Sequence, residues 1–269
     1  PNKVHFNVLL GSIRSGKSTL LNSLYLSERF MGGEQYDVRI LISSTAANDV
    51  TMKYMCEEFD YVFDDYSESL LEELLQMIDK DTLDRHYLLV IDDAMAENGI
   101  VQKKAGKPDK FSQLITRYRH IGSSVLETEG RLAICVALQF FKYLTPTLRN
   151  QIQGLFLMGT FAEHELKKIA EAYSFMGGSV REFIRLFNET RKGEWDFSYI
   201  NVPRLEMYRN FDELVYSKKL SNDNCIDNDE DSETEESNDR GAKGKNVRKP
   251  RKGKKKQGGE GASKITTKL

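Results

Sequence analysis

The chain has 269 residues, of which 39% are hydrophobic and 30% are charged, and its formal net charge at pH 7 is −2. That length suits one large α/β domain with an extension, and the hydrophobic fraction is enough for a real core. No apolar run approaches the roughly 18 residues of a membrane span, and no signal peptide precedes the first expected strand. The cysteines Cys56, Cys135 and Cys225 are far apart, which excludes a disulfide framework and favours a reducing compartment. We therefore expect a soluble intracellular protein with no membrane partner.

Charge is distributed unevenly along the chain. The segment 222–239 carries nine acidic residues and no basic one, whereas the segment from Arg240 onward carries twelve basic residues against Glu260 alone. Neither segment has enough apolar content to fold. The run Arg248–Lys256 (RKPRKGKKK) is typical of a nuclear-localisation or nucleic-acid patch, although a solvated tail needs no function. We expect a folded domain over residues 1–220 and a disordered acidic-then-basic tail over 221–269.

Short apolar runs alternate with helical patterns in the first 200 residues or so. The strand pattern is found at Val4–Leu10, Val38–Ile42, Tyr87–Ile91, Leu132–Leu138, Gly154–Met158 and, as a terminal strand, Trp195–Ile200. The helical pattern is found at Ser18–Leu26, Asn48–Phe59, Ser67–Ile78 with Ser67 as a candidate N-cap, Ser112–His120, Glu163–Tyr173 and Ser179–Glu189. This alternation predicts an α/β fold with a mainly parallel central sheet flanked by helices.

The first strand ends at the sequence GSIRSGKS, which matches the phosphate-binding pattern G-x-x-x-x-G-K-[ST] in full. A chance match in a chain of this length is roughly a one-in-a-hundred event, and a strand before with a helix after is the required context. Glycines let successive N–H groups face a β-phosphate, and the helix N-terminus adds positive potential. The pattern predicts binding of a nucleoside triphosphate, with Lys17 on the β- and γ-phosphates and Ser18 on Mg²⁺. The expected contact residues are Gly11, Ser12, Ile13, Arg14, Ser15, Gly16, Lys17, Ser18 and Thr19.

Two acidic residues, Asp92 and Asp93, end the apolar strand Tyr87–Ile91. An acidic residue in that position beside a P-loop holds the Mg²⁺ water shell, and we assign this role to Asp92. A second carboxylate can polarise the attacking water, which makes Asp93 the candidate catalytic base. The alternative is a solvated turn or a helix cap, because aspartate favours both.

A glutamine and three arginines are further candidates for the site. Gln139 is the first polar residue after the strand Leu132–Leu138, and its amide can sense the γ-phosphate or orient water. A buried or capping glutamine is the alternative. Arg117, Arg119 and Arg149 are each a candidate finger acting in trans, a surface charge or a nucleic-acid contact, and their spacing does not choose among these.

Taken in order, these motifs resemble a known family. The chain has a P-loop, a strand ending in paired acids, the run RYRHI, a strand ending in LQ, and the run TLRNQ. This order resembles the genome-packaging ATPases of large and mid-sized eukaryotic DNA viruses, including the poxvirus-type and virophage enzymes of the FtsK–HerA superfamily. The resemblance covers roughly residues 4–200. The P-loop alone is unspecific, but its combination with RYRHI, ALQ and LRNQ is fairly specific.

The resemblance implies a RecA/FtsK–HerA-like P-loop domain in a homo-oligomeric ring that drives double-stranded DNA into a preformed capsid. It implies ATP and Mg²⁺, a capsid or portal vertex as partner, and an infected host cell as the location. The superfamily usually has Asp-Glu where this chain has Asp92 and Asp93, so the second carboxylate must reach about 1.5 Å further. For the arginine finger, Arg117 or Arg119 is favoured, with Arg149 next.

Four lysines follow the acidic pair in a polar segment, Glu97–Lys110, and are the candidate DNA contacts: Lys103, Lys104, Lys107 and Lys110. Affinity for duplex DNA comes mainly from neutralising phosphates, so a motor with a mildly acidic body needs such concentrated charge. A solvated loop is the alternative. The competing functions are another P-loop enzyme, such as a helicase or nucleotide kinase, and a scaffold that binds ATP for assembly only.

Overall fold

The computed structural model describes residues 4–30, 35–46, 48–93, 109–122 and 130–218. All of them belong to the first of two units of the chain, Pro1–Asp227, and the second unit, Asn228–Leu269, lies outside the described residues. Both the expected tail and the lysines Lys103, Lys104 and Lys107 lie outside them as well.

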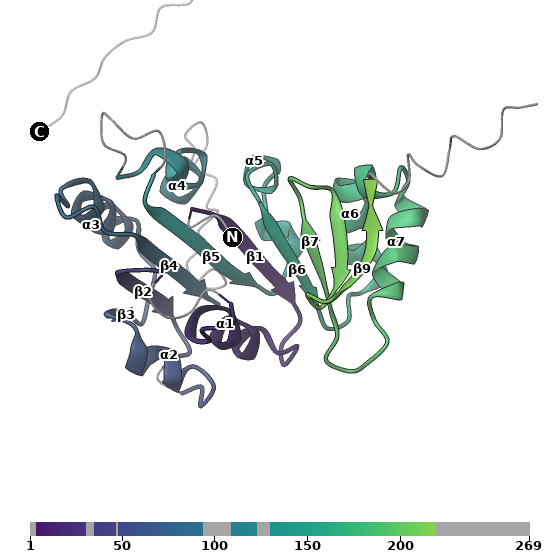
Figure 1. Cartoon of the computed structure of the whole chain (residues 1–269), viewed down its shortest axis with the longest axis horizontal. Coiled ribbons are helices and arrows are strands. Elements are labelled where there is room, and N and C mark those ends of the chain that lie inside the picture. The colour runs from purple at the N-terminus through teal and green to yellow at the C-terminus, as the bar shows by residue number, and fades with distance from the viewer. Residues whose placement is uncertain (1–3, 31–34, 47, 94–108, 123–129, 219–269) are drawn as a thin grey trace, which may run out of the picture. The chain divides into compact units, whose positions relative to one another are not determined.

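A nine-stranded sheet with the order β3-β2-β4-β5-β1-β6-β7-β8-β9 forms the centre of the described unit (Figure 1). Its strands are β1 (Phe6–Gly11), β2 (Val38–Ser43), β3 (Tyr61–Phe63), β4 (Tyr87–Asp92), β5 (Leu132–Leu138), β6 (Gly154–Met158), β7 (Phe197–Asn201), β8 (Glu206–Arg209) and β9 (Glu213–Ser217). Strands β1 to β6 pair in parallel, and β7, β8 and β9 add antiparallel neighbours beyond β6. The expected mainly parallel α/β fold is therefore confirmed.

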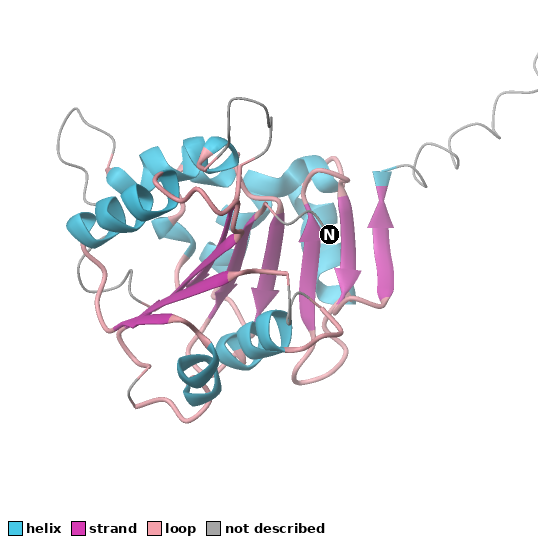
Figure 2. Ribbon diagram, turned by 60° about the vertical axis from the view of Figure 1, so that its left-hand side comes forward, coloured by secondary structure: helices cyan, strands magenta, loops and turns pink. Residues whose placement is uncertain are grey.

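Helices cover both faces of this sheet, as Figure 2 shows. They are α1 (Lys17–Leu26), α2 (Lys53–Glu58), α3 (Glu68–Asp79), α4 (Lys110–Arg117), α5 (Pro146–Arg149), α6 (Glu163–Tyr173) and α7 (Val180–Glu189), with 3₁₀ turns at Tyr118–His120, Phe141–Tyr143 and Ser174–Met176. None of the helices that the structure describes is long and apolar enough to cross a membrane.

Side chains that alternate along the strands form two separate cores. On one face, Leu9, Val90 and Ala137 pack with α1 and α2. On the other face, Val8 and Ile91 pack with residues of α3, α4, α6 and α7. Strands buried on both faces are the expected consequence of parallel pairing, because the crossover helices cover the sheet.

Several elements differ from the sequence expectation. The helix expected at Asn48–Phe59 is only the six residues of α2, because a hydrogen-bonded turn around Asp49 occupies the start of that segment. The strand expected at Trp195–Ile200 corresponds to β7, but β7 begins at Phe197. It is also not the terminal strand, because β8 and β9 follow it. Strands β3, β8 and β9 and helix α5 were not expected. By contrast, Ser67 does cap α3, and its hydroxyl accepts a hydrogen bond from the Leu70 N–H at 3.1 Å.

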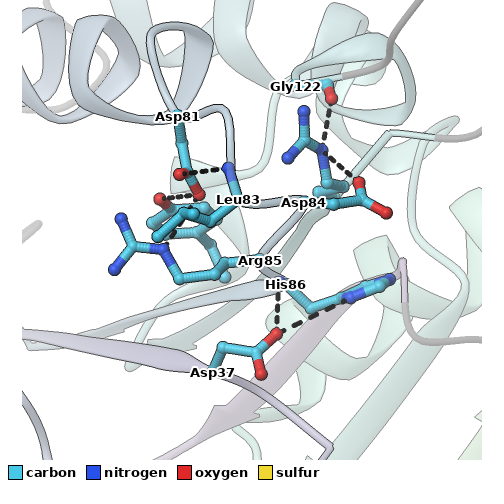
Figure 3. Close-up of polar contacts among 9 residues, drawn as sticks. Asp37, Asp81, Leu83, Asp84, Arg85, His86 and Gly122 are labelled. Atoms are coloured by element: carbon cyan, nitrogen blue, oxygen red, sulfur yellow. Dashed lines mark hydrogen bonds and ion pairs between the residues drawn. The ribbon is translucent and has the colours of Figure 1, made fainter.

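A polar cluster fixes the end of β4 that lies opposite its acidic pair (Figure 3). Asp81 Oδ2 accepts hydrogen bonds from Arg85 Nε at 3.0 Å and from the Tyr87 hydroxyl at 2.7 Å. These bonds hold the pKa of the Asp81 carboxyl below its usual range. Asp37 Oδ2 accepts a hydrogen bond from the His86 N–H at 2.7 Å, which ties the start of β4 to β2. The register of β4, and hence the position of its last residue, is fixed from this end.

Candidate functional site

The carboxyl ends of the parallel strands bring the predicted residues to one edge of the sheet. Asp92 at the end of β4 pairs with Ala137 on β5, and Leu10 on β1 pairs with Leu138 on β5. Because β5 lies between β4 and β1, Gln139 follows β5 at a point between the acidic pair and the P-loop. The residues from three strands therefore meet along this edge, and α1 starts there (Figure 1).

The loop between β1 and α1 curls back on itself. Gly16 has φ of 86° and ψ of 16° at the N-cap position of α1, a left-handed conformation that glycine adopts without strain. No side chain of the described residues caps this helix start, so its first N–H groups face the loop. The ammonium of Lys17 donates hydrogen bonds to the carbonyls of Gly11 and Ser12, both at 3.0 Å. This geometry suits an anion held by backbone N–H groups and one cation.

Asp92 is buried in an unusual state. It is 2% exposed, and its Oδ1 atom has no hydrogen-bond partner among the described residues. Burial first, and then the neighbouring Asp93, raise the pKa of Asp92 to about 7, while Lys17 acts in the opposite direction. Burial likewise lowers the pKa of Lys17. A buried carboxylate oxygen without a donor can be stabilised by a cation.

This oxygen and the Ser18 hydroxyl are hard ligands of the kind that Mg²⁺ prefers. Ser18 follows Lys17 directly and lines the cleft described below. The residues present therefore fit the expected metal ion, which Ser18 at the start of α1 and Asp92 at the end of β4 would hold.

Asp93 has φ of 50°, so the chain turns sharply after β4. The turn separates the two acids: Asp92 points into the protein, and Asp93 is half-buried and lines the cleft. The carboxylate that reaches the cleft surface is thus the one expected to act on water.

A cleft of about 780 Å³ opens over the P-loop. It is within the size range of small-molecule sites, about 300–1,000 Å³. Its walls come from the P-loop and α1, from the segment after β2, from the end of β4, and from the turn before β7. The lining residues are Ile13, Arg14, Ser15, Gly16, Lys17, Ser18, Thr19, Ser44, Thr45, Asn48, Asp49, Val50, Thr51, Asp93 and Trp195.

The wall after β2 was missed by sequence reasoning. Asp49 is a second carboxylate at the cleft, in addition to Asp93, and contributes to the raised pKa of Asp92. Asp49 Oδ1 accepts a hydrogen bond from the Thr51 N–H at 2.8 Å, and the Asn22 amide of α1 donates to the Thr51 carbonyl at 2.5 Å. Polar residues directly after an apolar strand were the available signal, since β2 lies beside β4 and ends at the same edge.

The opposite wall was also missed. Gly11 pairs with Met158 on β6, and Met158 pairs with Phe197 on the antiparallel β7. The turn before β7 therefore arrives at the P-loop, with Trp195 at the cleft. No sequence pattern indicated this, because it depends on β7 running opposite to β6.

The three arginines lie near the amino ends of the parallel strands, opposite the carboxyl ends where the P-loop lies. The carbonyl of Arg119 accepts a hydrogen bond from the Gly130 N–H just before β5 begins, and Arg117 precedes it at the end of α4. Arg149 ends α5, before β6. Its guanidinium lies 3.9 Å from the centre of the Phe141 ring, and burial lowers its pKa. None of the three is at the P-loop of its own chain, so any role as a finger would have to be in trans.

Lys110 was expected in a loop, but it is the first residue of α4. Its ammonium forms an ion pair with Glu72 at 3.5 Å, and both side chains are exposed. Lys103, Lys104 and Lys107 lie outside the described residues.

Comparison with protein-family models gives no match, and comparison with curated protein sequences gives none either. Among solved structures, the chain is similar to the genome packaging NTPase B204 from Sulfolobus turreted icosahedral virus 2. For its complex with AMP the identity is 17% and the TM-score 0.54, over 78% of this chain and 98% of that one. For its complex with ATP-gammaS the identity is 17% and the TM-score 0.52, over 78% and 97%. B204, the DNA-packaging ATPase from Sulfolobus turreted icosahedral virus, has 16% identity and a TM-score of 0.53, over 76% and 96%.

Identity this low shows the fold alone. The resemblance expected from the motifs is confirmed at that level, because the neighbours span most of this chain and nearly all of their own. The described part of the chain has a P-loop NTPase fold and is similar in fold to the genome packaging NTPase B204.

Proposed function

We propose that this protein is an ATPase that couples ATP hydrolysis to translocation of double-stranded DNA, and that the DNA is a viral genome entering a capsid. The observation that carries the proposal is a P-loop lysine at the cleft close to Asp92, a buried acid whose Oδ1 has no partner among the described residues and which stands directly before the cleft-lining Asp93. Proteins rarely bury such a carboxylate without a functional reason.

The first step is binding of the triphosphate. The N–H groups at the start of α1 and the Lys17 ammonium hold the phosphates, and Lys17 leaves the loop carbonyls to do so. Ser18 and Asp92 hold Mg²⁺, which when bound polarises the terminal phosphate.

The second step is attack by water. Asp93, at the cleft surface, accepts the proton of the attacking water. Gln139, half-buried between the acids and the P-loop, orients that water or senses the γ-phosphate. An arginine from a neighbouring copy, Arg117 or Arg119 before Arg149, stabilises the developing charge. This last role requires a ring in which the amino ends of one copy's parallel strands, with the nearby arginines, face the cleft of the next copy.

The DNA-packaging role is supported by the B204 structures, which are described as a genome packaging NTPase and a DNA-packaging ATPase. We extend that role to this chain. From the motif resemblance we further propose a homo-oligomeric ring, a capsid or portal vertex as partner and a location in an infected cell. Lys103, Lys104, Lys107 and Lys110 are the proposed DNA contacts.

The test is DNA-dependent motor activity of the full chain. We expect linear duplex DNA to stimulate ATP hydrolysis and the protein to displace a third strand from a triplex on that DNA. Lys17→Ala should abolish both activities, and replacing the four lysines by alanine should abolish the stimulation alone. Hydrolysis that ignores DNA would favour another P-loop enzyme, and ATP binding without hydrolysis would favour a scaffold.

A further inference from the structure

We propose that Trp195 is the surface on which the base of the bound nucleotide stacks. The inference rests on the proposed binding of nucleotide at the P-loop and adds the part of the site that recognises the base. Trp195 is 68% exposed although it lines the cleft, and it is the chain's one tryptophan. A large exposed aromatic face at a ligand cleft indicates a ligand that is flat and apolar on one side.

Trp195 lies directly against the P-loop. A β-carbon built on Gly16 would be 3.9 Å from Cε3 of the Trp195 ring. The strand register explains this proximity, because β1 pairs with β6 and Met158 of β6 pairs with Phe197, two residues after Trp195. A nucleotide whose phosphates are held by the P-loop would therefore extend past the loop next to the Trp195 ring.

The direction of the ligand follows from the order of the strands. Asp92 ends β4 and Asp93 follows it, and β4 lies on one side of β1 in the sheet, whereas Trp195 precedes β7 on the other side. The terminal phosphate would be drawn toward the Mg²⁺ that Ser18 and Asp92 would hold. The rest of the nucleotide must then extend across the P-loop, away from β4 and toward β6 and β7, which brings the base to Trp195.

The turn that carries Trp195 is already ordered for this role. Asp196 Oδ2 accepts hydrogen bonds from the Lys192 N–H at 3.1 Å and the Gly193 N–H at 2.7 Å. Asp196 Oδ1 accepts another from the Asn210 amide at 3.0 Å. These bonds fix the backbone on both sides of Trp195, so stacking a base would order little additional chain.

Stacking on an indole face accepts every base, because each has a π-face. The proposal therefore predicts comparable binding of ATP and GTP, and a loss of both when the ring is removed. It also predicts that removing the ring leaves the affinity for a ligand without a base nearly unchanged.

The experiment measures equilibrium binding of ATP, GTP and inorganic tripolyphosphate, each with Mg²⁺, to the full chain. Because Trp195 is the only tryptophan, intrinsic fluorescence reports on it directly. We expect ATP to quench or shift that fluorescence and tripolyphosphate to leave it nearly unchanged. Calorimetry measures the affinities of the variants. Trp195→Ala should lower the affinity for ATP and for GTP by about 10-fold and the affinity for tripolyphosphate by less than about 2-fold. Trp195→Phe should retain most of the affinity.

Phe175→Ala is the matched control, since Phe175 is also an exposed aromatic, 48% exposed, in a turn that follows α6. It should change no affinity. Wild-type ATP affinity in Trp195→Ala, or an equal loss for ATP and tripolyphosphate, would overturn the proposal. If Lys17→Ala also bound every ligand like the wild type, the proposed function would have failed. A Lys17→Ala defect beside an unaffected Trp195→Ala would reject only the stacking role.

Discussion

The backbone angle φ of Asp93 favours aspartate over glutamate at this position. Asp93 has φ of 50°, in the left-handed region, where aspartate and asparagine are several-fold enriched among non-glycine residues. Glutamate lacks the short polar side chain that bonds locally in this conformation. The Asp-Asp pair, which departs from the Asp-Glu of the superfamily that the motifs resemble, is thus matched to the turn after β4.

Replacing Asp93 by asparagine should separate binding from hydrolysis. Asp93→Asn keeps the left-handed turn but removes the group that accepts the proton. We expect ATP turnover to fall by about 100-fold or more, with ATP affinity within about 3-fold of wild type. Steady-state phosphate release and calorimetry measure the two quantities. Asp64→Asn, at an exposed acid after β3, is the control, and an unchanged rate in Asp93→Asn would remove Asp93 from the proposed chemistry.

Gly159, after β6, offers a second test at this scale. Its φ is +67°, and a β-carbon on it would lie 2.7 Å from Ser15 Cβ and 2.9 Å from Ser12 Oγ. Its carbonyl accepts a hydrogen bond from the Arg191 guanidinium at 2.6 Å, which ties this loop to the segment after α7 while it packs against Ser12 and Ser15 of the P-loop. Gly159→Ala should therefore distort the P-loop and weaken ATP binding by about 10-fold or more.

Gly178→Ala is the matched control, because Gly178 has φ of +80° but no atom within 4 Å of the added β-carbon. Both variants should lose about 1 kcal/mol of stability from backbone strain, and Gly159→Ala should lose more because its β-carbon overlaps Ser15 and Ser12. Denaturant unfolding measures both losses. Only Gly159→Ala should lose nucleotide affinity. Equal affinities in the two variants would show that the contact with the P-loop does not matter.

At the scale of elements, the strands that build the site were predictable because they are buried on both faces. β4, β5 and β6 are uninterrupted apolar runs, and the expected and observed bounds of β5 and β6 coincide. β8 and β9 are short and half-buried, so they carry no such run, and they form a sheet edge only because β7 turns antiparallel. Trp195 reaches the cleft because β7 runs antiparallel to β6, and Asp49 does so through the turn that replaces the start of the expected helix Asn48–Phe59. Neither feature was predicted, which is why both residues were missed.

The cluster at the start of β4 gives a pH-dependent prediction. Hydrogen bonds from Arg85 and Tyr87 lower the pKa of Asp81 below its ordinary 3.8, so the folded state holds the carboxylate more strongly than the unfolded state does. The resulting stabilisation is fully present above about pH 4 and is lost as the pH falls below that value toward the folded pKa.

Asp81→Asn should lower the midpoint of thermal unfolding by a few degrees at pH 7. The difference from wild type should shrink steadily below about pH 4. Differential scanning calorimetry between pH 3 and pH 7 measures it, with Asp64→Asn as the surface control. A difference that stayed constant across this range would mean that the carboxylate charge contributes nothing.

For the molecule as a whole, the sequence predicts a division of charge that matters for DNA. The acidic segment 222–239 is followed by a basic one that includes Arg248–Lys256. Both lie outside the described residues. We propose that the acidic segment competes with DNA for the basic one, since each attracts the other at low ionic strength.

Deleting residues 222–239 should therefore raise non-specific affinity for duplex DNA at low salt, by about 10-fold, and the gain should fade as salt rises. Fluorescence anisotropy of a labelled duplex across a salt series measures it. A deletion of the basic run Arg248–Lys256 should have the opposite effect. Equal affinities of the wild type and the acidic deletion would rule out the competition.

The central claim is that the cleft over the P-loop hydrolyses ATP. Its most direct test is the steady-state rate of Mg²⁺-dependent phosphate release by the purified full chain, beside Lys17→Ala and the surface variant Lys168→Ala. We expect the wild type and Lys168→Ala to turn over ATP equally and Lys17→Ala to be about 100-fold slower or worse. A wild-type rate no greater than that of Lys17→Ala would contradict the account.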